Sequence, residues 1–207
     1  MADSFSKSIT LLDNARQGDF RDLGRLLERY RNYLAILARQ GFDPRLQGKL
    51  DASDLVQETF VEAIQSFPCF RGDTEGQFLA WLRRILASRL SAASRRFLLA
   101  RARDVRLEHR CAEALDRSSS ALQRLAASQT TPSEHVFRHE RAVLLADALA
   151  SIPDDYREVI LLRHVEGLPL GVVAQRMGRT KESVRHLWVR GLAALHTRLS
   201  SGLGDEA

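Results

Sequence analysis

The sequence has few of the features that mark a disulfide-bonded, secreted or membrane-spanning protein. Its 207 residues include two cysteines, Cys69 and Cys111, which lie far apart and form no Cys-x-x-Cys pair. Two free thiols are therefore expected. No apolar run reaches the length of a transmembrane helix, and the first twenty residues carry no secretory pattern. We therefore expect a cytoplasmic protein without a membrane segment.

Strand patterns are nearly absent, and only five prolines interrupt the chain. Apolar residues instead recur at helical spacing, and Arg, Glu, Leu and Ala are abundant. The sequence therefore predicts an all-α fold. Hydrophobic residues make up 44% of the chain, which is enough for a core in one large domain or two small ones. The net charge of +5 and the pI near 9.7 favour an acidic partner, without choosing between nucleic acid and membrane.

Signatures of an enzyme or a metal site are also missing. The chain has no glycine-rich phosphate loop and no nucleophile elbow. His135 and His139 are four residues apart and Cys111 lies upstream, so a metal site can be imagined. No acidic residue completes a His-Glu-x-x-His pattern, and the pair borders a segment that we expect to be a linker. We therefore expect no metal, no cofactor and no catalytic site.

The clearest local pattern is a helix-turn-helix over residues 170–198. Gly178 can take the positive φ that a tight turn requires, and the Thr180 hydroxyl can cap the following helix. Val184 and Leu187, three residues apart, are expected to bury one side of that helix. The glycine, the cap and the two aliphatic residues fall in register, which predicts two helices joined at a sharp angle.

Burying Val184 and Leu187 turns a polar face outward. Such a helix suits the major groove of DNA, where side chains read base edges and flanking arginines contact phosphates. The alternative is a helical hairpin whose basic face is only solvated. The residues that we expect to contact duplex DNA are Arg179, Thr180, Lys181, Glu182, Arg185, His186 and Arg190.

An acidic ridge is expected on a helix that begins at Asp51 or Ser53 and ends at Pro68. The expected buried residues are Leu55, Val56, Phe60, Ala63, Ile64 and Phe67, and the ridge consists of Asp54, Gln57, Glu58 and Glu62. Early carboxylates stabilise a helix N-terminus, which explains Asp51 and Asp54 but does not explain the later pair. The ridge faces either a basic protein surface or water, and composition alone does not choose.

A second basic surface is expected on a helix that begins at Phe78 and continues toward Arg110. Its arginines are accompanied by Phe78 and Trp81, and the segment contains no lysine from Arg83 onward. Guanidinium groups suit bidentate contacts with phosphate, although a run of charge is often only a solvated face. The arginines are Arg83, Arg84, Arg89, Arg95, Arg96, Arg101, Arg103, Arg106 and Arg110.

The expected organisation is two small helical domains joined by a flexible linker. A frayed segment over residues 1–10 would precede a first helix capped by Asp13 or Asn14 and ending at Gly41. Residues 111–137 are rich in Ala, Ser and Gln with sparse, small apolar residues, so we expect a linker with at most a loose helical turn. The front domain would then cover residues 10–110 and the back domain residues 138–200.

Two separate stretches resemble a known family. DLVQETFVEA, followed by FRG and FLAWLRRI, is similar to conserved region two of bacterial extracytoplasmic-function (ECF) sigma factors. LADALASIPDDYREVILLRHVEGLPLGVVAQRMGRTKESV resembles their region four. The resemblance implies a factor that binds core RNA polymerase, directs it to specific promoters and helps to melt the DNA. It leaves open whether an anti-sigma protein is a partner.

The resemblance also assigns roles to particular residues. The residues that would dock on polymerase are Asp51, Asp54, Gln57 and Glu58. The residues that would open the proximal promoter element and hold its single strand are Arg71, Gln77, Trp81, Arg83, Arg84, Ser88, Arg95 and Arg96. The helix from Lys181 would read the distal element as duplex DNA.

Some positions depart from the family pattern. Ser88 stands where an asparagine is usual, which affects the details of melting, and Gly171 and Val172 replace polar or acidic residues. The main rival interpretation is a two-domain regulator whose front half senses a ligand or dimerises. Such a protein would need neither an acidic docking ridge nor a second basic surface.

Overall fold

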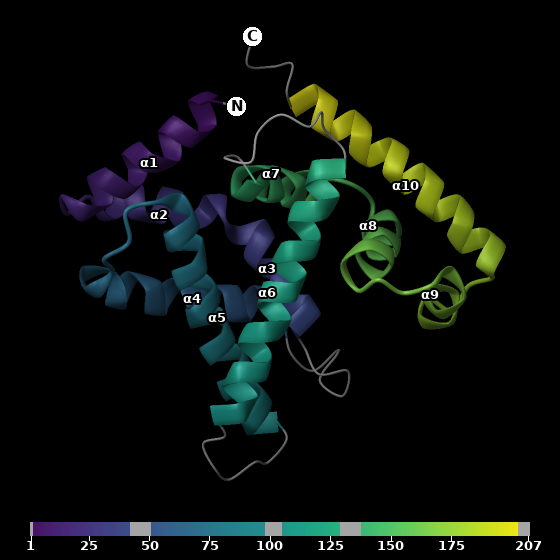
Figure 1. The fold of residues 1–207 in the computed structure, drawn as a ribbon, viewed down its shortest axis with the longest axis horizontal. Coiled ribbons are helices and arrows are strands. Elements are labelled where there is room, and N and C mark those ends of the chain that lie inside the picture. The colour runs from purple at the N-terminus through teal and green to yellow at the C-terminus, as the bar shows by residue number, and fades with distance from the viewer. Residues whose placement is uncertain (1, 42–50, 98–104, 129–137, 203–207) are drawn as a thin grey trace. The chain divides into compact units, whose positions relative to one another are not determined.

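The computed structural model describes residues 2–41, 51–97, 105–128 and 138–202, and every regular element in these ranges is a helix (Figure 1). The predicted all-α fold is confirmed. The chain divides into two compact units, Met1–Arg117 and Ser118–Ala207. None of the described helices combines the length and the hydropathy needed to cross a lipid bilayer.

Three helices occupy the N-terminal part of the first unit. They are α1 (Ala2–Arg16), α2 (Phe20–Arg29) and α3 (Arg31–Gly41). The expected frayed start and single long helix are therefore wrong. Gly18 adopts a φ of 100°, and the Asp19 side chain accepts hydrogen bonds from the backbone N–H groups of the first turn of α2. This turn and cap separate α1 from α2, because both local signals outweigh the continuous apolar period.

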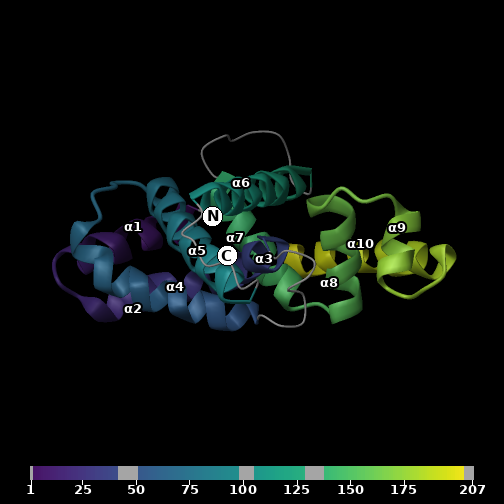
Figure 2. The same ribbon diagram turned by 90° about the horizontal axis from the view of Figure 1, so that it is seen from below.

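The next two helices carry most of the predicted site. Asp51 caps α4 (Ala52–Ser66) by accepting from Ser53 N, as predicted, and a 3-10 turn, η2 (Phe67–Cys69), follows. The helix α5 (Glu75–Phe97) packs on α4, and Figure 2 shows the two side by side. The predicted burial of Ile64 is wrong, since it is 43% exposed. The predicted continuation through residues 98–104 lies outside the described residues.

The core of the first unit is built around aromatic rings. The Phe78 ring lies 5.9 Å from Tyr30, 5.5 Å from Phe70 and 5.5 Å from Trp81, centroid to centroid. The Tyr30 hydroxyl donates to Glu75 Oε1 at 2.8 Å in the buried interior. Burial, together with the negative charge of Glu75, raises the pKa of Tyr30 above its usual value. The hydroxyl therefore stays protonated and ties α2 to the first turn of α5.

Most of the expected linker is helical. The helix α6 (Val105–Ser128) has a buried stripe in place of the predicted loose turn. Its buried side chains recur every three or four residues, and they are Cys111, Leu115, Ser118, Ser119, Ala121, Leu122, Leu125 and Ala126. The expectation failed because small Ser and Ala residues fill buried positions that are usually occupied by larger apolar residues. Burial raises the pKa of the Cys111 thiol, and neither cysteine forms a disulfide.

The second unit continues from α6 through α7 (Arg138–Ala150), α8 (Asp154–Ile160), α9 (Leu170–Arg176) and α10 (Lys181–Gly202). A short π-helical segment, η4 (Leu161–Val165), extends α8 by one wide turn. Gly167, with a φ of 71°, stops it before Pro169, as predicted. In α7, Leu145 is buried, Leu144 is half-buried and Ala150 is exposed.

Candidate nucleic-acid interface

The helix-turn-helix is formed by α9, a four-residue turn and α10. Gly178 takes a φ of 62°, and Arg179 N donates to Ala174 O at 3.0 Å, which closes the end of α9. Thr180 Oγ1 then accepts from Ser183 N at 3.2 Å and caps α10. The predicted roles of the glycine and the threonine are confirmed.

The first turns of α10 present the predicted polar face. Val184 is 0% exposed and anchors the helix, while the polar side chains on its opposite side are exposed. Glu182 Oε1 lies 3.2 Å from His186 Nε2, so one acidic and one basic group of this face lie beside each other. The exposed residues are Lys181, Glu182, Arg185, His186, Val189 and Arg190.

Arg179 differs from the other predicted contacts of this motif. Its Nη2 atom lies 2.6 Å from Asp155 Oδ2 on α8, so the guanidinium ties the turn to the helix below it. Both side chains are partly exposed, and such an ion pair contributes little stability by itself. Arg179 therefore has an acidic partner within the protein, whereas the basic side chains of Lys181, Arg185 and Arg190 are exposed.

Two close contacts hold α10 against α8 and η4. Gly191 faces α8 so closely that an added Cβ would lie 3.2 Å from Tyr156 Cβ and 3.3 Å from Ile160 Cδ1. Trp188 Nε1 donates to His164 Nε2 at 2.9 Å, and the two rings stack with centroids 6.0 Å apart. The helix α10 is thereby fixed near its middle by the close approach of the Gly191 backbone to α8 and by the Trp188–His164 pair.

The His164 contact predicts that the second unit loses stability in acid. His164 accepts the Trp188 hydrogen bond only while Nε2 is unprotonated, and burial, followed by the nearby Arg163 charge, lowers the pKa of His164. The unfolded chain then binds this proton more readily than the folded chain does. The free energy of unfolding should fall as the pH drops from the usual histidine value of 6.5 toward the lower folded pKa.

Thermal unfolding above and below this pH would measure the effect. The variant His164→Gln keeps a possible acceptor for Trp188 but does not titrate, so its loss in acid should be smaller than that of the wild type. The other histidines are present in both proteins, so the comparison isolates the contribution of His164. An equal loss in both proteins would assign the pH dependence to another group.

The residues of the predicted acidic ridge on α4 fall into two groups, one exposed and one facing α5. Asp54 and Gln57 are exposed. In contrast, Glu58 Oε2 lies 3.8 Å from Arg96 Nη2 and Glu62 Oε2 lies 3.6 Å from Arg89 Nη2, so both glutamates face α5. The outward acidic surface is therefore narrower than the sequence indicated. It consists of the N-terminal half of α4 together with the capping carboxylate of Asp51.

Arg31 supports this exposed face from the first turn of α3. Its guanidinium makes paired hydrogen bonds to Glu28, at 2.6 Å and 2.8 Å, and lies 5.1 Å above the centre of the Phe60 ring. Turned toward α3, the Gln57 side-chain oxygen accepts from Arg31 Nη1 at 3.1 Å. The sequence analysis missed Arg31, because its contacts with Gln57 and Phe60 join helices that are far apart in the chain.

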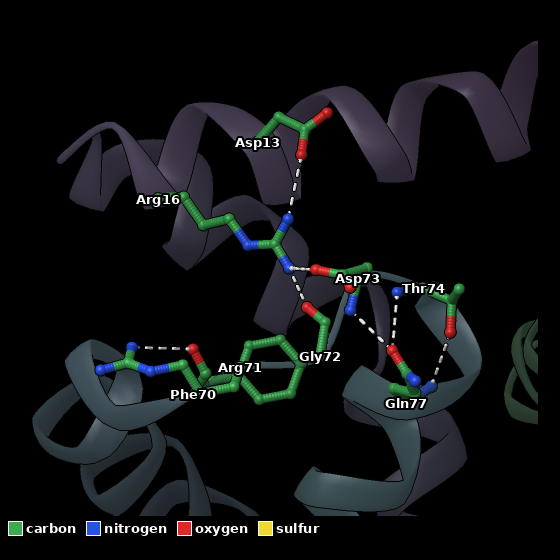
Figure 3. Close-up of polar contacts among 8 residues, drawn as sticks. All are labelled: Asp13, Arg16, Phe70, Arg71, Gly72, Asp73, Thr74 and Gln77. Atoms are coloured by element: carbon green, nitrogen blue, oxygen red, sulfur yellow. Dashed lines mark hydrogen bonds and ion pairs between the residues drawn. The ribbon is translucent and has the colours of Figure 1, made fainter.

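The loop before α5 is closed by a capping box. Gln77 N donates to Thr74 Oγ1 at 3.2 Å, while Gln77 Oε1 accepts from Thr74 N at 3.2 Å and from Asp73 N at 2.6 Å (Figure 3). Arg71 Nη1 donates to the Pro68 carbonyl at 2.9 Å. Gln77, predicted as a DNA contact, therefore uses its side-chain oxygen inside the loop, and its amide group remains at the exposed surface.

Trp81 lies beside this loop, and its ring is half-buried. The ring centre is 4.9 Å from that of Phe70, the residue that begins the loop. One side of the indole is covered by Phe67, Phe70 and Phe78. Trp81, predicted to help hold the single strand, is therefore part of an aromatic cluster that also packs against the loop.

The predicted basic residues of α5 have different surroundings. Arg83 has a side chain only 15% exposed, and its Nε lies 3.0 Å from Asp116 Oδ1 on α6, so the structure gives it an internal partner. Arg95 Nη1 donates to Ser91 Oγ at 2.7 Å, and Ser88 is half-buried. Arg84 and Arg96 are exposed. These two are the predicted arginines of α5 that are most available to an external phosphate.

No group of three or more His, Cys, Asp or Glu residues with metal-binding geometry occurs among the described residues. Of the two histidines considered for a metal site, His135 lies outside the described residues. His139 Nδ1 lies 3.1 Å from Gln123 Nε2.

Two segments of the chain match known family models. Residues 26–98 match the family model of Sigma-70 region 2, and residues 142–195 match that of Sigma-70, region 4. An ECF RNA polymerase sigma-E factor of Haemophilus influenzae is 28% identical over 187 residues, which cover 85% of this chain and 92% of that protein. The ECF RNA polymerase sigma-E factor of Escherichia coli K12 is 26% identical over 84% of this chain and 90% of that protein.

The chain belongs to the ECF family of RNA polymerase sigma factors. As a sigma factor it directs RNA polymerase to promoters, so core polymerase and promoter DNA are its partners. A solved structure of CnrH in complex with the cytosolic domain of CnrY aligns with 97% of this sigma factor and 99% of that chain, at 25% identity and a TM-score of 0.34.

Proposed function

We propose that the first unit of this sigma factor docks on polymerase and captures the melted strand, while the second unit reads the distal promoter element as duplex DNA. The observation that carries this proposal is the capped turn before α10, which leaves one basic face of the helix exposed. A recognition helix entering the major groove with its N-terminal residues is the ordinary use of this geometry.

Within the second unit, Lys181 and Arg185 are the side chains that we assign to base edges. Both are exposed and lie on the side of α10 opposite the buried Val184. Arg190 is exposed one turn and a half further along, where a guanidinium would meet the DNA backbone. Arginine can donate two parallel hydrogen bonds to a guanine, whereas a phosphate contact carries no base information.

The variants Arg185→Ala and Arg190→Ala test this assignment. Arg185→Ala should weaken cognate binding by about 1–3 kcal/mol and relax the preference at one base pair. Arg190→Ala should weaken binding to all sequences alike and reduce the slope of affinity against salt concentration. Fluorescence anisotropy over a panel of single-base promoter variants measures both effects. Identical behaviour of the two variants would mean that the recognition face has been assigned wrongly.

Within the first unit, we propose that the segment Phe70–Gln77 and the exposed arginines of α5 hold the unpaired strand. Extruding a base costs a few kcal/mol, and stacking on an aromatic ring returns about 1–3 kcal/mol per base. The half-buried Trp81 beside the loop and the exposed Arg84 and Arg96 support this use. Because Arg83 is engaged with Asp116, we assign it to the support of α5.

We further propose that Asp51, Asp54 and Gln57 contact polymerase directly. Glu58, which lies beside Arg96, would support this docking face from its edge. Exposed carboxylates at the start of α4, in a protein of positive net charge, support docking on a basic surface of the polymerase. The polymerase supplies the chemistry, so we assign no catalytic role to this chain and place it in the cytoplasm with the polymerase. An anti-sigma partner would inhibit by covering α4 or α10.

A further inference from the structure

Arg16 connects the N-terminal helix to the loop before α5. It stands in the last turn of α1, outside the segment that matches Sigma-70 region 2. Its Nη2 atom donates to the Gly72 carbonyl and lies 3.2 Å from Asp73 Oδ1, while Nη1 lies 3.3 Å from Asp13 Oδ1 (Figure 3). One guanidinium group therefore bridges its own helix and a loop 56 residues later in the chain.

The loop itself depends on close packing at Gly72. A Cβ added to Gly72 would lie 2.5 Å from Phe70 Cζ and 2.9 Å from Gln77 Cβ. These distances are too short for real carbon atoms, so the backbone passes directly beneath the Phe70 ring. The capping box fixes the C-terminal side of the loop from within, through Gln77. Arg16 fixes the Gly72 carbonyl from the other side.

The Arg16 guanidinium restrains the loop mainly through the Gly72 carbonyl. Its side chain is 32% exposed, which limits the value of the ion pair with the largely exposed Asp73. The contact with the Gly72 carbonyl differs, because it pins a backbone atom at the point where the loop packs under Phe70. A loop that is already held in its binding shape gives up less conformational freedom when a ligand arrives.

We propose that Arg16 is a positioning residue that holds Gly72 and Asp73 in the shape in which the loop receives an unstacked promoter base. The inference rests on the proposed function, namely that this loop captures the melted strand. Arg16 acts through the loop backbone and is not assigned a contact with the base. Its loss should lower the fraction of loops in the competent shape.

The test uses holoenzyme and a forked DNA whose proximal element is unpaired, taken from a promoter that wild-type holoenzyme selects from a random library. If Arg16→Ala leaves the loop competent for about one tenth of the time, the apparent Kd for the fork rises about tenfold. Arg16→Lys should restore part of this loss, since an ammonium group can still donate to the Gly72 carbonyl. Affinity for core polymerase should be unchanged.

Two comparison variants separate the possible results. Arg21→Ala removes the same charge from an exposed position at the start of α2 and should change fork binding far less. Gly72→Ala distorts the loop directly, because the new Cβ collides with Phe70. If Gly72→Ala weakens fork binding and Arg16→Ala does not, the inference about Arg16 is overturned and the proposed function stands. If neither variant weakens it, or no promoter is selected, both are overturned.

A spectroscopic measurement distinguishes an effect of Arg16 on the loop conformation from an effect on the stability of the whole unit. With Trp188→Phe as the background, Trp81 is the remaining tryptophan, and it lies against Phe70 beside the loop. Arg16→Ala should shift the Trp81 emission of the folded protein while the thermal unfolding midpoint changes little. A lowered midpoint with unchanged emission, or an equal loss of core binding and fork binding, would assign Arg16 a merely structural role.

Discussion

Reversing the charge at the start of α4 should abolish assembly with core polymerase. In the variant Asp54→Arg, an exposed carboxylate is replaced by a cation on the face that we assign to docking. Juxtaposed like charges at an interface cost several kcal/mol, so the Kd for core should rise by more than about a hundredfold. Glu58 is left unchanged, because an arginine there would face Arg96 and disturb the packing of α4 on α5.

The measurement is co-purification with core polymerase, followed by titration with labelled sigma factor. Circular dichroism should show unchanged helix content, since the Asp54 side chain is exposed. Glu158→Arg, which reverses a charge at an exposed position of α8 in the second unit, serves as the control and should bind core normally. If Asp54→Arg binds like the control, the exposed face of α4 is only a solvated surface.

The largest loss of stability is expected from Phe78→Ala. Phe78 is 0% exposed, and its ring contacts Tyr30, Phe67, Phe70 and Trp81. Truncating a buried phenylalanine removes its apolar transfer energy and leaves a cavity, at a cost of about 3–5 kcal/mol. The aromatic cluster also carries the loop before α5, so capture of the unpaired strand should fail together with stability.

Urea unfolding followed by Trp81 fluorescence, again in the Trp188→Phe background, measures this loss in the first unit. The matched control is Phe20→Ala, which removes the same ring from a position that is 64% exposed. Its effect should remain within about 0.5 kcal/mol. Equal losses in the two variants would show that the aromatic cluster does not carry the core of this unit.

Features set by neighbouring residues were predictable from the sequence. The turn at Gly178 and the caps at Thr180 and Asp51 depend on backbone conformation and on hydrogen bonds spanning two or three residues. The outward direction of Lys181 and Arg185 follows from the helical period once Val184 is placed inside. These signals act at short range, where one sequence contains all the participants.

Features that depend on distant partners were missed or assigned wrongly. Nothing near Arg83 indicates that Asp116, 33 residues later, holds its guanidinium. The exposure of Ile64 likewise depends on which face of α4 meets α5. The helix α6 was missed for a different reason, since buried Ser118 and Ser119 look polar in a composition analysis although they fall on the helical period. Periodicity of small residues was the signal that could have revealed it.

The distant anchor of the loop limits how freely promoter preference can be exchanged between relatives. A chimera that received only residues 70–77 from another sigma factor would inherit the loop without the guanidinium that holds the Gly72 carbonyl from 56 residues upstream. Transfer of the whole unit Met1–Arg117 would carry the anchor, the aromatic rings and the capping box together. The segment that can be exchanged between relatives is therefore the whole folded unit. It includes the N-terminal helix α1, although α1 precedes the residues that match the family model.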